Sequence, residues 1–68
     1  MEQTKLKVLI ENELYPLILA NSEDQLDKIT MDSVRKSNNQ FIGKYKEELT
    51  IENIDFLTEY IWTVINKM

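Results

Sequence analysis

The sequence predicts an all-α fold, a small bundle of three to four helices with short capped connections. Apolar side chains recur at intervals of three and four residues along most of the chain, which is the period of one helix face. Residues that commonly cap helix N-termini precede the apolar segments, at Thr4, Ser22, Thr30 and Thr50. No stretch alternates between apolar and polar side chains for long enough to form a strand. We therefore expect residues 1–68 to form a single helical domain.

The first helix is expected to run from its cap at Thr4 to about Ala20. Its main apolar face is expected to contain Leu6, Leu9, Ile10, Leu14, Leu17 and Ile18. Pro16 lies inside this pattern and has no N–H to donate to the carbonyl of Asn12, so we expect a kink or a break there. Glu13 falls near the middle of the apolar face. It either pairs with a lysine across an interface or is rotated into solvent by the kink.

Two further helices are expected in the middle of the chain. Ser22 and Gln25 fit a capping box for a short helix over residues 23–29. Thr30 is expected to cap a longer helix over residues 31–42 or beyond. The apolar stripe of this longer helix is expected to contain Val34, Phe41, Ile42 and Tyr45.

The last helix is expected over residues 51–67, with Thr50 as its cap. Its broad apolar face is expected to contain Ile51, Ile54, Leu57, Ile61, Val64, Ile65 and Met68. Phe56 falls among the polar residues on the other side, with Tyr60 beside it and Trp62 at the edge of the apolar face. Surface aromatics flanked by acids are typical of the centre of a binding patch, so these three predict a partner-binding site. Alternatively, Phe56 packs under a neighbouring helix.

The first helix also carries a second apolar row. Val8, Tyr15 and Leu19 lie roughly opposite the main face when an α-helical period is assumed. A helix that is apolar on two sides is either central or shared between subunits, and a chain of 68 residues has little room for a central helix. These three residues therefore predict the interface of a homodimer, which would complete the bundle.

Charge is distributed unevenly along the sequence. Residues 1–27 and 47–68 each carry a net charge of −4, whereas residues 28–46 carry +4. The basic segment could contact nucleic acid, because Arg recognises guanine and Asn or Gln recognises adenine in the major groove. The candidate residues are Arg35, Lys36, Asn39, Gln40, Lys44 and Lys46. The alternative is that this segment only neutralises the acidic helices, within the fold or across a dimer.

Composition excludes several kinds of chemistry. The chain contains neither Cys nor His, so it lacks thiolate ligands, disulfides and the commonest general base. No phosphate loop, calcium loop or nucleophile–base pair is present in the sequence, and we expect no catalytic residue, metal or cofactor. The longest uninterrupted apolar stretch, residues 15–20, is far too short to span a membrane, and we expect a cytoplasmic protein.

These observations favour a small, acidic, non-enzymatic module that binds a protein partner as a regulator or inhibitor. Phages and mobile genetic elements encode regulators of this size and acidity, which is an analogy only. The alternative is a DNA-binding transcriptional regulator that uses the basic helix around residues 31–46.

Overall fold

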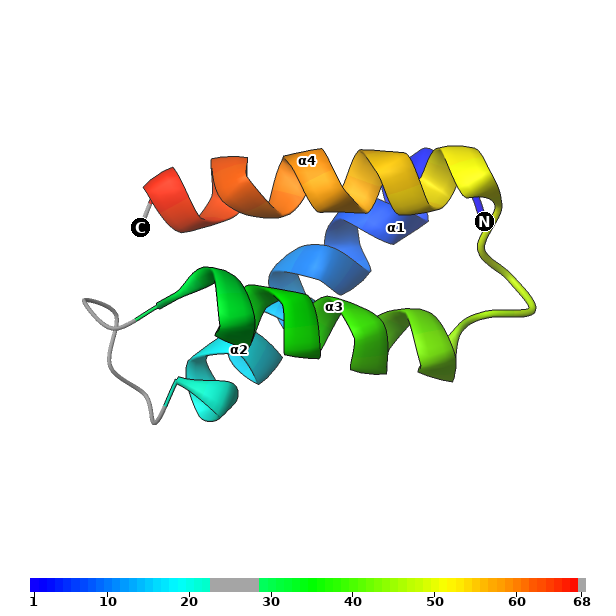
Figure 1. Cartoon of the computed structure of the whole chain (residues 1–68). Helices are drawn as coiled ribbons and strands as arrows, with labels where there is room; N and C mark the ends of the chain where they lie inside the picture. Colours follow the sequence, from blue (N-terminus) through cyan, green and yellow to red (C-terminus); the bar gives the residue numbers. More distant parts are fainter. Residues whose placement is uncertain (23–28, 68) are drawn as a thin grey trace.

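The computed structural model of the chain describes residues 1–22 and 29–67 (Figure 1). The elements, in chain order, are α1 (Gln3–Leu9), the π-helical turn η1 (Ile10–Leu14), α2 (Tyr15–Asn21), α3 (Met31–Lys44) and α4 (Ile51–Lys67). No strand occurs among the described residues, so the prediction of an all-helical fold is confirmed for them. The short helix predicted over 23–29, with its capping box at Ser22 and Gln25, falls mainly outside the described residues.

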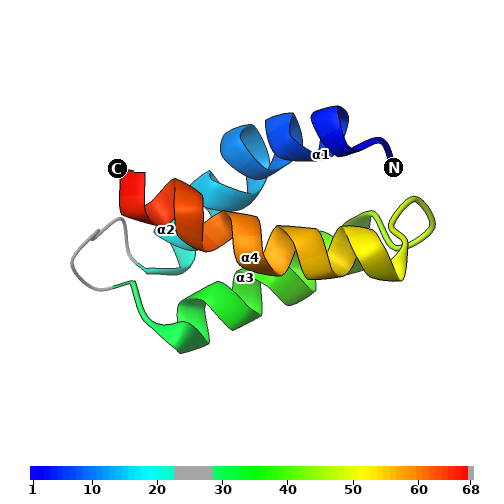
Figure 2. The ribbon, with the colours of Figure 1, turned by 90° about the horizontal axis from the view of Figure 1, so that it is seen from above.

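The helices form two layers. α1, η1 and α2 follow one another without a loop and cross behind the other two helices, with α1 packed on α4 and α2 packed on α3 (Figures 1 and 2). α3 and α4 run in opposite directions in the front layer of Figure 1. The shortest dimension is 17 Å. Two packed helices with axes about 8–10 Å apart and Cα cylinders of about 2.3 Å radius span about 13–15 Å, so this dimension fits two helices and no third layer. Every helix therefore keeps one side at the surface.

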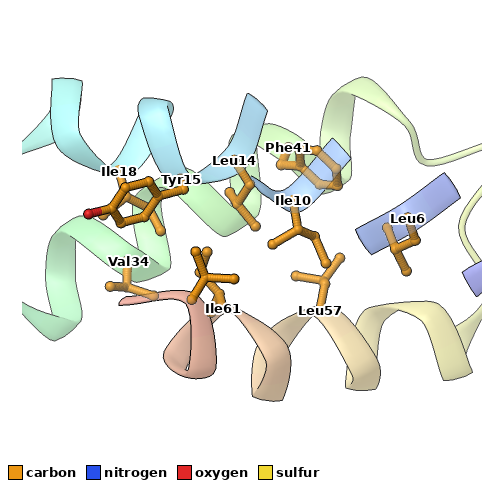
Figure 3. Close-up of a cluster of buried hydrophobic side chains, with 10 residues drawn as sticks. Leu6, Ile10, Leu14, Tyr15, Ile18, Val34, Phe41, Leu57 and Ile61 are labelled. Carbon is orange, nitrogen blue, oxygen red and sulfur yellow. The ribbon is translucent and has the colours of Figure 1, made fainter. Parts of the chain in front are cut away.

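The buried apolar side chains form one core between these layers (Figure 3). The N-terminal helices and η1 contribute Leu6, Ile10, Leu14, Tyr15 and Ile18, and the other two helices contribute Val34, Phe41, Leu57, Ile61 and Val64. Because α3 and α4 supply only part of their circumference to this core, each has a flank that the core does not cover.

The interruption predicted at Pro16 is a π-helical turn. η1 ends at Leu14, two residues before the proline, and the N–H of Tyr15 donates to the carbonyl of Ile10, five residues back rather than four. A π turn accommodates one additional residue within a continuous helix. Pro16 has no N–H to continue the ordinary hydrogen-bond ladder, so this wider turn absorbs the mismatch without breaking the helix.

The π turn changes which side chains face the core. At about 100° per residue, an unbroken α-helix would place Ile18 about 120° around the axis from Leu6. The additional residue removes about 100° of that rotation, and both side chains are fully buried on one side. The same shift turns Tyr15 into the core, where it is 6% exposed, and leaves Leu17 half-buried at the edge. The expectation that Tyr15 lies opposite the core face is therefore wrong.

Two of the predicted caps are present and one is absent. The hydroxyl of Thr30 accepts from the N–H of Ser33 at 3.2 Å, and the Ser33 hydroxyl accepts from the N–H of Thr30 at 3.1 Å. The hydroxyl of Thr50 likewise accepts from the N–H of Asn53 at 3.1 Å. Thr4 caps nothing, because α1 already begins at Gln3. The Asn53 side chain donates to the carbonyl of Met1 at 3.1 Å, so the start of α1 is tied to α4 instead.

Candidate interaction surface

Side-chain hydrogen bonds join α2 to α3. The amide of Asn21 donates to the hydroxyl of Ser37 at 2.7 Å and to the side-chain oxygen of Gln40 at 3.1 Å. Ser37 is buried and donates in turn to the carbonyl of Ser33. Gln40, one of the predicted nucleic-acid contacts, is thus engaged within the fold.

A second set of polar contacts joins η1 to α3. Lys44 and the Tyr45 hydroxyl both donate to the carboxylate of Glu13. These hydrogen bonds hold the pKa of Glu13 below its ordinary value. Neither alternative for Glu13 is correct: the lysine comes from the same chain, and the carboxylate is half-buried. An open hollow of about 700 Å³ lies beside this pair, between Pro16 and Leu17 on one side and α3 on the other.

Aromatic contacts join α1 and η1 to α4. Phe56 and Tyr60 stack with their ring centroids 5.2 Å apart, and both rings are half-buried against the core. The Tyr60 hydroxyl donates to a carboxylate oxygen of Glu11 at 3.0 Å, which raises the pKa of Tyr60. The Lys7 ammonium lies 5.7 Å from the centre of the Tyr60 ring. The contacts to α1 and η1 are made by Tyr60, whereas Phe56 stacks on Tyr60 within α4 and packs against the core.

Trp62 lies on the other flank of α4. At about 100° per residue it is some 160° around the helix from Tyr60, on the side turned away from α1. Ile51, Ile54 and Ile65 share this flank, where Ile54, Trp62 and Ile65 are half-buried. Ile51 is 78% exposed, so its predicted place on the core face is wrong. Met68 lies outside the described residues.

α3 presents a matching flank. Its contacts with α2 and η1 use Ser37, Gln40 and Lys44, and Met31 and Ile42 lie on the opposite side of the core stripe. Ile42 is half-buried and Met31 is 55% exposed. On a helical wheel, both flanks point away from the N-terminal helices on which α3 and α4 pack. Met31 and Ile51 are exposed on these flanks, whereas Ile42, Trp62 and Ile65 are half-buried and also pack against the edge of the core. We call this apolar set the outer strip; it consists of Met31, Ile42, Ile51, Ile54, Trp62 and Ile65.

Charged side chains border the outer strip with opposite signs. On the α3 side is the basic row, defined as Arg35 and Lys36 on α3 and Lys46 in the turn that follows it, all exposed. On the α4 side is the acidic row, defined as Glu52, Asp55 and Glu59, all exposed. Asp32 lies on the same face as the basic row and reduces its net charge to +2. In the described part of the chain the ion pairs are Lys5–Glu48 and Glu13–Lys44, and neither row takes part in them.

The structure separates residues that the sequence analysis had grouped. Val8 is 50% exposed on α1 and Leu19 is half-buried on α2, whereas Tyr15 is in the core. Phe56 and Tyr60 occupy one flank of α4 and Trp62 the other. All six predicted nucleic-acid contacts are exposed, and two of them, Gln40 and Lys44, also bind α2 and η1.

Part of the outer strip was not predicted as surface. Ile65 was assigned to the core face of the last helix and does pack against the core. Met31, however, was read only as the start of a helix, and Ile51 and Ile54 were assigned to the core face of the last helix. The signal that could have found them is the width of that face, which covers more of the circumference than one neighbouring helix can bury.

Other kinds of site find no support in the described residues. Among them, no three acidic side chains converge as the ligands of a metal ion would. No helix in the same part of the chain has both the length and the apolar character needed to cross a membrane. No family model matches the chain, and comparison with curated proteins and with solved structures found no match.

Proposed function

We propose that the chain is a non-enzymatic protein-interaction module of the cytoplasm, acting as a regulator or inhibitor. The observation that carries this proposal is the outer strip, where apolar side chains from two helices remain at the surface. Trp and Met are enriched at the centres of protein interfaces, and charged residues are enriched at their rims. The outer strip has this arrangement, because Trp62 lies within it and the charged rows border it.

The chemistry of the outer strip defines its partner. An interacting protein must offer an apolar surface that covers Trp62 and its neighbours. It must also place acids against the basic row and bases against the acidic row, since unmatched charge at an interface costs affinity. A helical surface with one acidic and one basic edge meets both conditions.

The test uses two variants that introduce the same charge at exposed apolar positions. Ile51→Glu alters the outer strip, and Glu is favourable in the first turn of a helix, so α4 should persist. Val8→Glu is the matched control on α1. Proteins captured by the immobilised wild-type chain are purified, and their binding is measured by titration calorimetry.

We expect Ile51→Glu to weaken binding by at least about tenfold and Val8→Glu to leave it unchanged, because only the first buries a charge in the interface. Equal affinities for the wild type and Ile51→Glu would show that the outer strip does not bind the partner.

A second candidate function is DNA binding through α3. Arg35 and Asn39 are one turn apart on an exposed face of α3, with Lys36 and Lys46 also exposed, so base and phosphate contacts could form together. The test is fluorescence anisotropy of a labelled DNA duplex at about 50 and 200 mM salt, where phosphate-mediated binding weakens by orders of magnitude. Flat titrations at both salt concentrations would exclude this function. Binding that persists in Arg35→Ala/Lys36→Ala would exclude α3 as its surface.

A further inference from the structure

We propose that the outer strip binds a second copy of this chain, with α3 of each copy lying on α4 of the other. The proposal rests on the outer strip being a protein-binding surface and specifies its occupant. The apolar residues of the strip would then pack against one another between two copies, and α3 and α4 would each be covered on the side that the first core leaves open.

Charge complementarity identifies the occupant. A partner must match a basic row and an acidic row on opposite sides of one apolar strip, and a second copy carries both rows at the same separation. Symmetric pairing requires a surface that is complementary to itself, which this face provides. Neither row is neutralised by ion pairs among the described residues, so both can contribute to a contact between copies.

Symmetry also fixes how the copies are oriented. A face-to-face dimer has its twofold axis in the plane of the interface. If that axis runs along the helices, it exchanges the positions of α3 and α4, and each basic row meets the partner's acidic row. If the axis runs across the helices, α3 lies on α3 and α4 on α4, so like charges face each other. Like-charge contacts oppose association, and the charge pattern therefore selects the axis along the helices.

The test reverses each row separately and then combines the products. One variant is Arg35→Glu/Lys46→Glu, and the other is Asp55→Lys/Glu59→Lys; all four side chains are exposed. Sedimentation equilibrium measures the mass of each at sub-millimolar concentration. We expect the wild type at twice the chain mass of 8.1 kDa. Each variant alone should show a dissociation constant raised by about a hundredfold, since both of its charged contacts become repulsive.

Mixing the two variants should restore the dimer. In the mixed pair, the acidic α3 of one variant faces the basic α4 of the other, and the unaltered acidic and basic rows face each other at the second contact. Rescue cannot arise from misfolding, because misfolded chains would not recover on mixing. Lys5→Glu/Lys7→Glu changes the net charge by the same amount on α1 and should dimerise as the wild type does.

Each other outcome overturns the inference. A wild-type chain that is monomeric throughout the concentration range would show that the occupant is not a second copy. A wild-type dimer whose two variants also dimerise alone, or fail to associate when mixed, would exclude α3 on α4. These outcomes leave the proposed function standing, because the Ile51→Glu titration tests the outer strip against a purified partner independently.

Discussion

The side of α3 and α4 that faces the N-terminal helices differs sharply from the side that faces away. On the inner side, several polar groups are matched within the chain: Asn21 binds Ser37 and Gln40, and Glu13 binds Lys44. The buried side-chain oxygen of Asn38 has no hydrogen-bond partner among the described residues. On the outer side, the apolar strip is at the surface and the charged rows form none of the ion pairs seen in the described residues. The fully buried core side chains lie on the inner side, whereas on the outer side Ile42, Trp62 and Ile65 only pack against the edge of the core and Met31 and Ile51 are exposed. This difference is why we place binding on the outer side.

The largest expected loss of stability comes from changing the rotational alignment of the core side chains on the inner side of the fold. The π turn holds one additional residue, so deleting Asn12 in a Pro16→Ala background, where no proline interrupts the ordinary hydrogen-bond ladder, should let η1 become an α-helical turn with Leu6 and Ile18 still aligned. We expect the unfolding free energy to fall by about 1 kcal/mol. Deleting Asn39 from the regular helix α3 should instead rotate Phe41 out of the core and cost at least about 3 kcal/mol.

Urea denaturation followed by circular dichroism measures both deletions. Equal losses in the two would mean that the π turn does not set the register of the core. A loss of unfolding free energy in the Asn39 deletion alone would support the role of the π turn in aligning the core, because both deletions remove an exposed Asn.

The second effect compares two isoleucines on α4. Ile61 is fully buried on the inner side, so Ile61→Ala should lower the unfolding free energy by about 2–4 kcal/mol through lost burial and a residual cavity. Ile51 is 78% exposed on the outer side, so Ile51→Ala should change it by less than about 0.5 kcal/mol. Thermal and urea unfolding at dilute, matched concentrations measure both. A large loss for Ile51→Ala in a monomer would contradict its place outside the core.

The third effect is the hydrogen-bond pairing of α2 with α3. Asn21→Ala leaves Ser37 and Gln40 without their donor, and we expect a loss of about 1 kcal/mol in urea unfolding. Asn39→Ala is the matched control, since Asn39 is an exposed residue on the side of α3 that is turned away from α2. If the two substitutions had the same effect, the Asn21 hydrogen bonds would not contribute to stability.

The smallest effect is the pH dependence from Glu13. Its pKa is lowered from an ordinary value of 4.5, first by the hydrogen bond from Lys44 and then by that from Tyr45. A lowered folded-state pKa gives stability that is present above pH 4.5 and lost as the pH falls through the folded value. Glu13→Gln should therefore be less stable than the wild type by less than about 1 kcal/mol at neutral pH.

This difference in unfolding free energy between the wild type and Glu13→Gln should disappear as the pH is lowered. Urea titrations at a series of pH values measure it. A gap that is constant with pH would show that the carboxylate charge does not contribute to the contact with Lys44.

Local chemistry made part of the fold predictable. Thr30 and Thr50 cap α3 and α4 as expected, and α4 has the predicted bounds, because a cap depends on residues within one turn of it. Tyr15 and Leu17 were misplaced because a helical wheel assumes a constant period, and the π turn changes that period by one residue.

Contacts between distant residues could not be read from the sequence. Lys44 and Glu13 are 31 residues apart, and only the packing of α3 on η1 brings them together. The same holds for the candidate site. The apolar residues of α4 were correctly recognised as a broad face, but which neighbours cover each part of that face depends on how the helices pack. The outer strip became visible only when α3 was placed beside α4.

Trp62 offers the most direct measurement of the central claim, that the outer strip is covered when the chain acts. It is the single tryptophan, so quenching of its fluorescence by acrylamide reports on the outer strip in the unmodified protein. We predict that the quenching constant falls severalfold as the wild-type concentration rises into the range of dimerisation, and stays high in Arg35→Glu/Lys46→Glu. A quenching constant independent of wild-type concentration, in a chain shown by sedimentation to dimerise, would contradict the account.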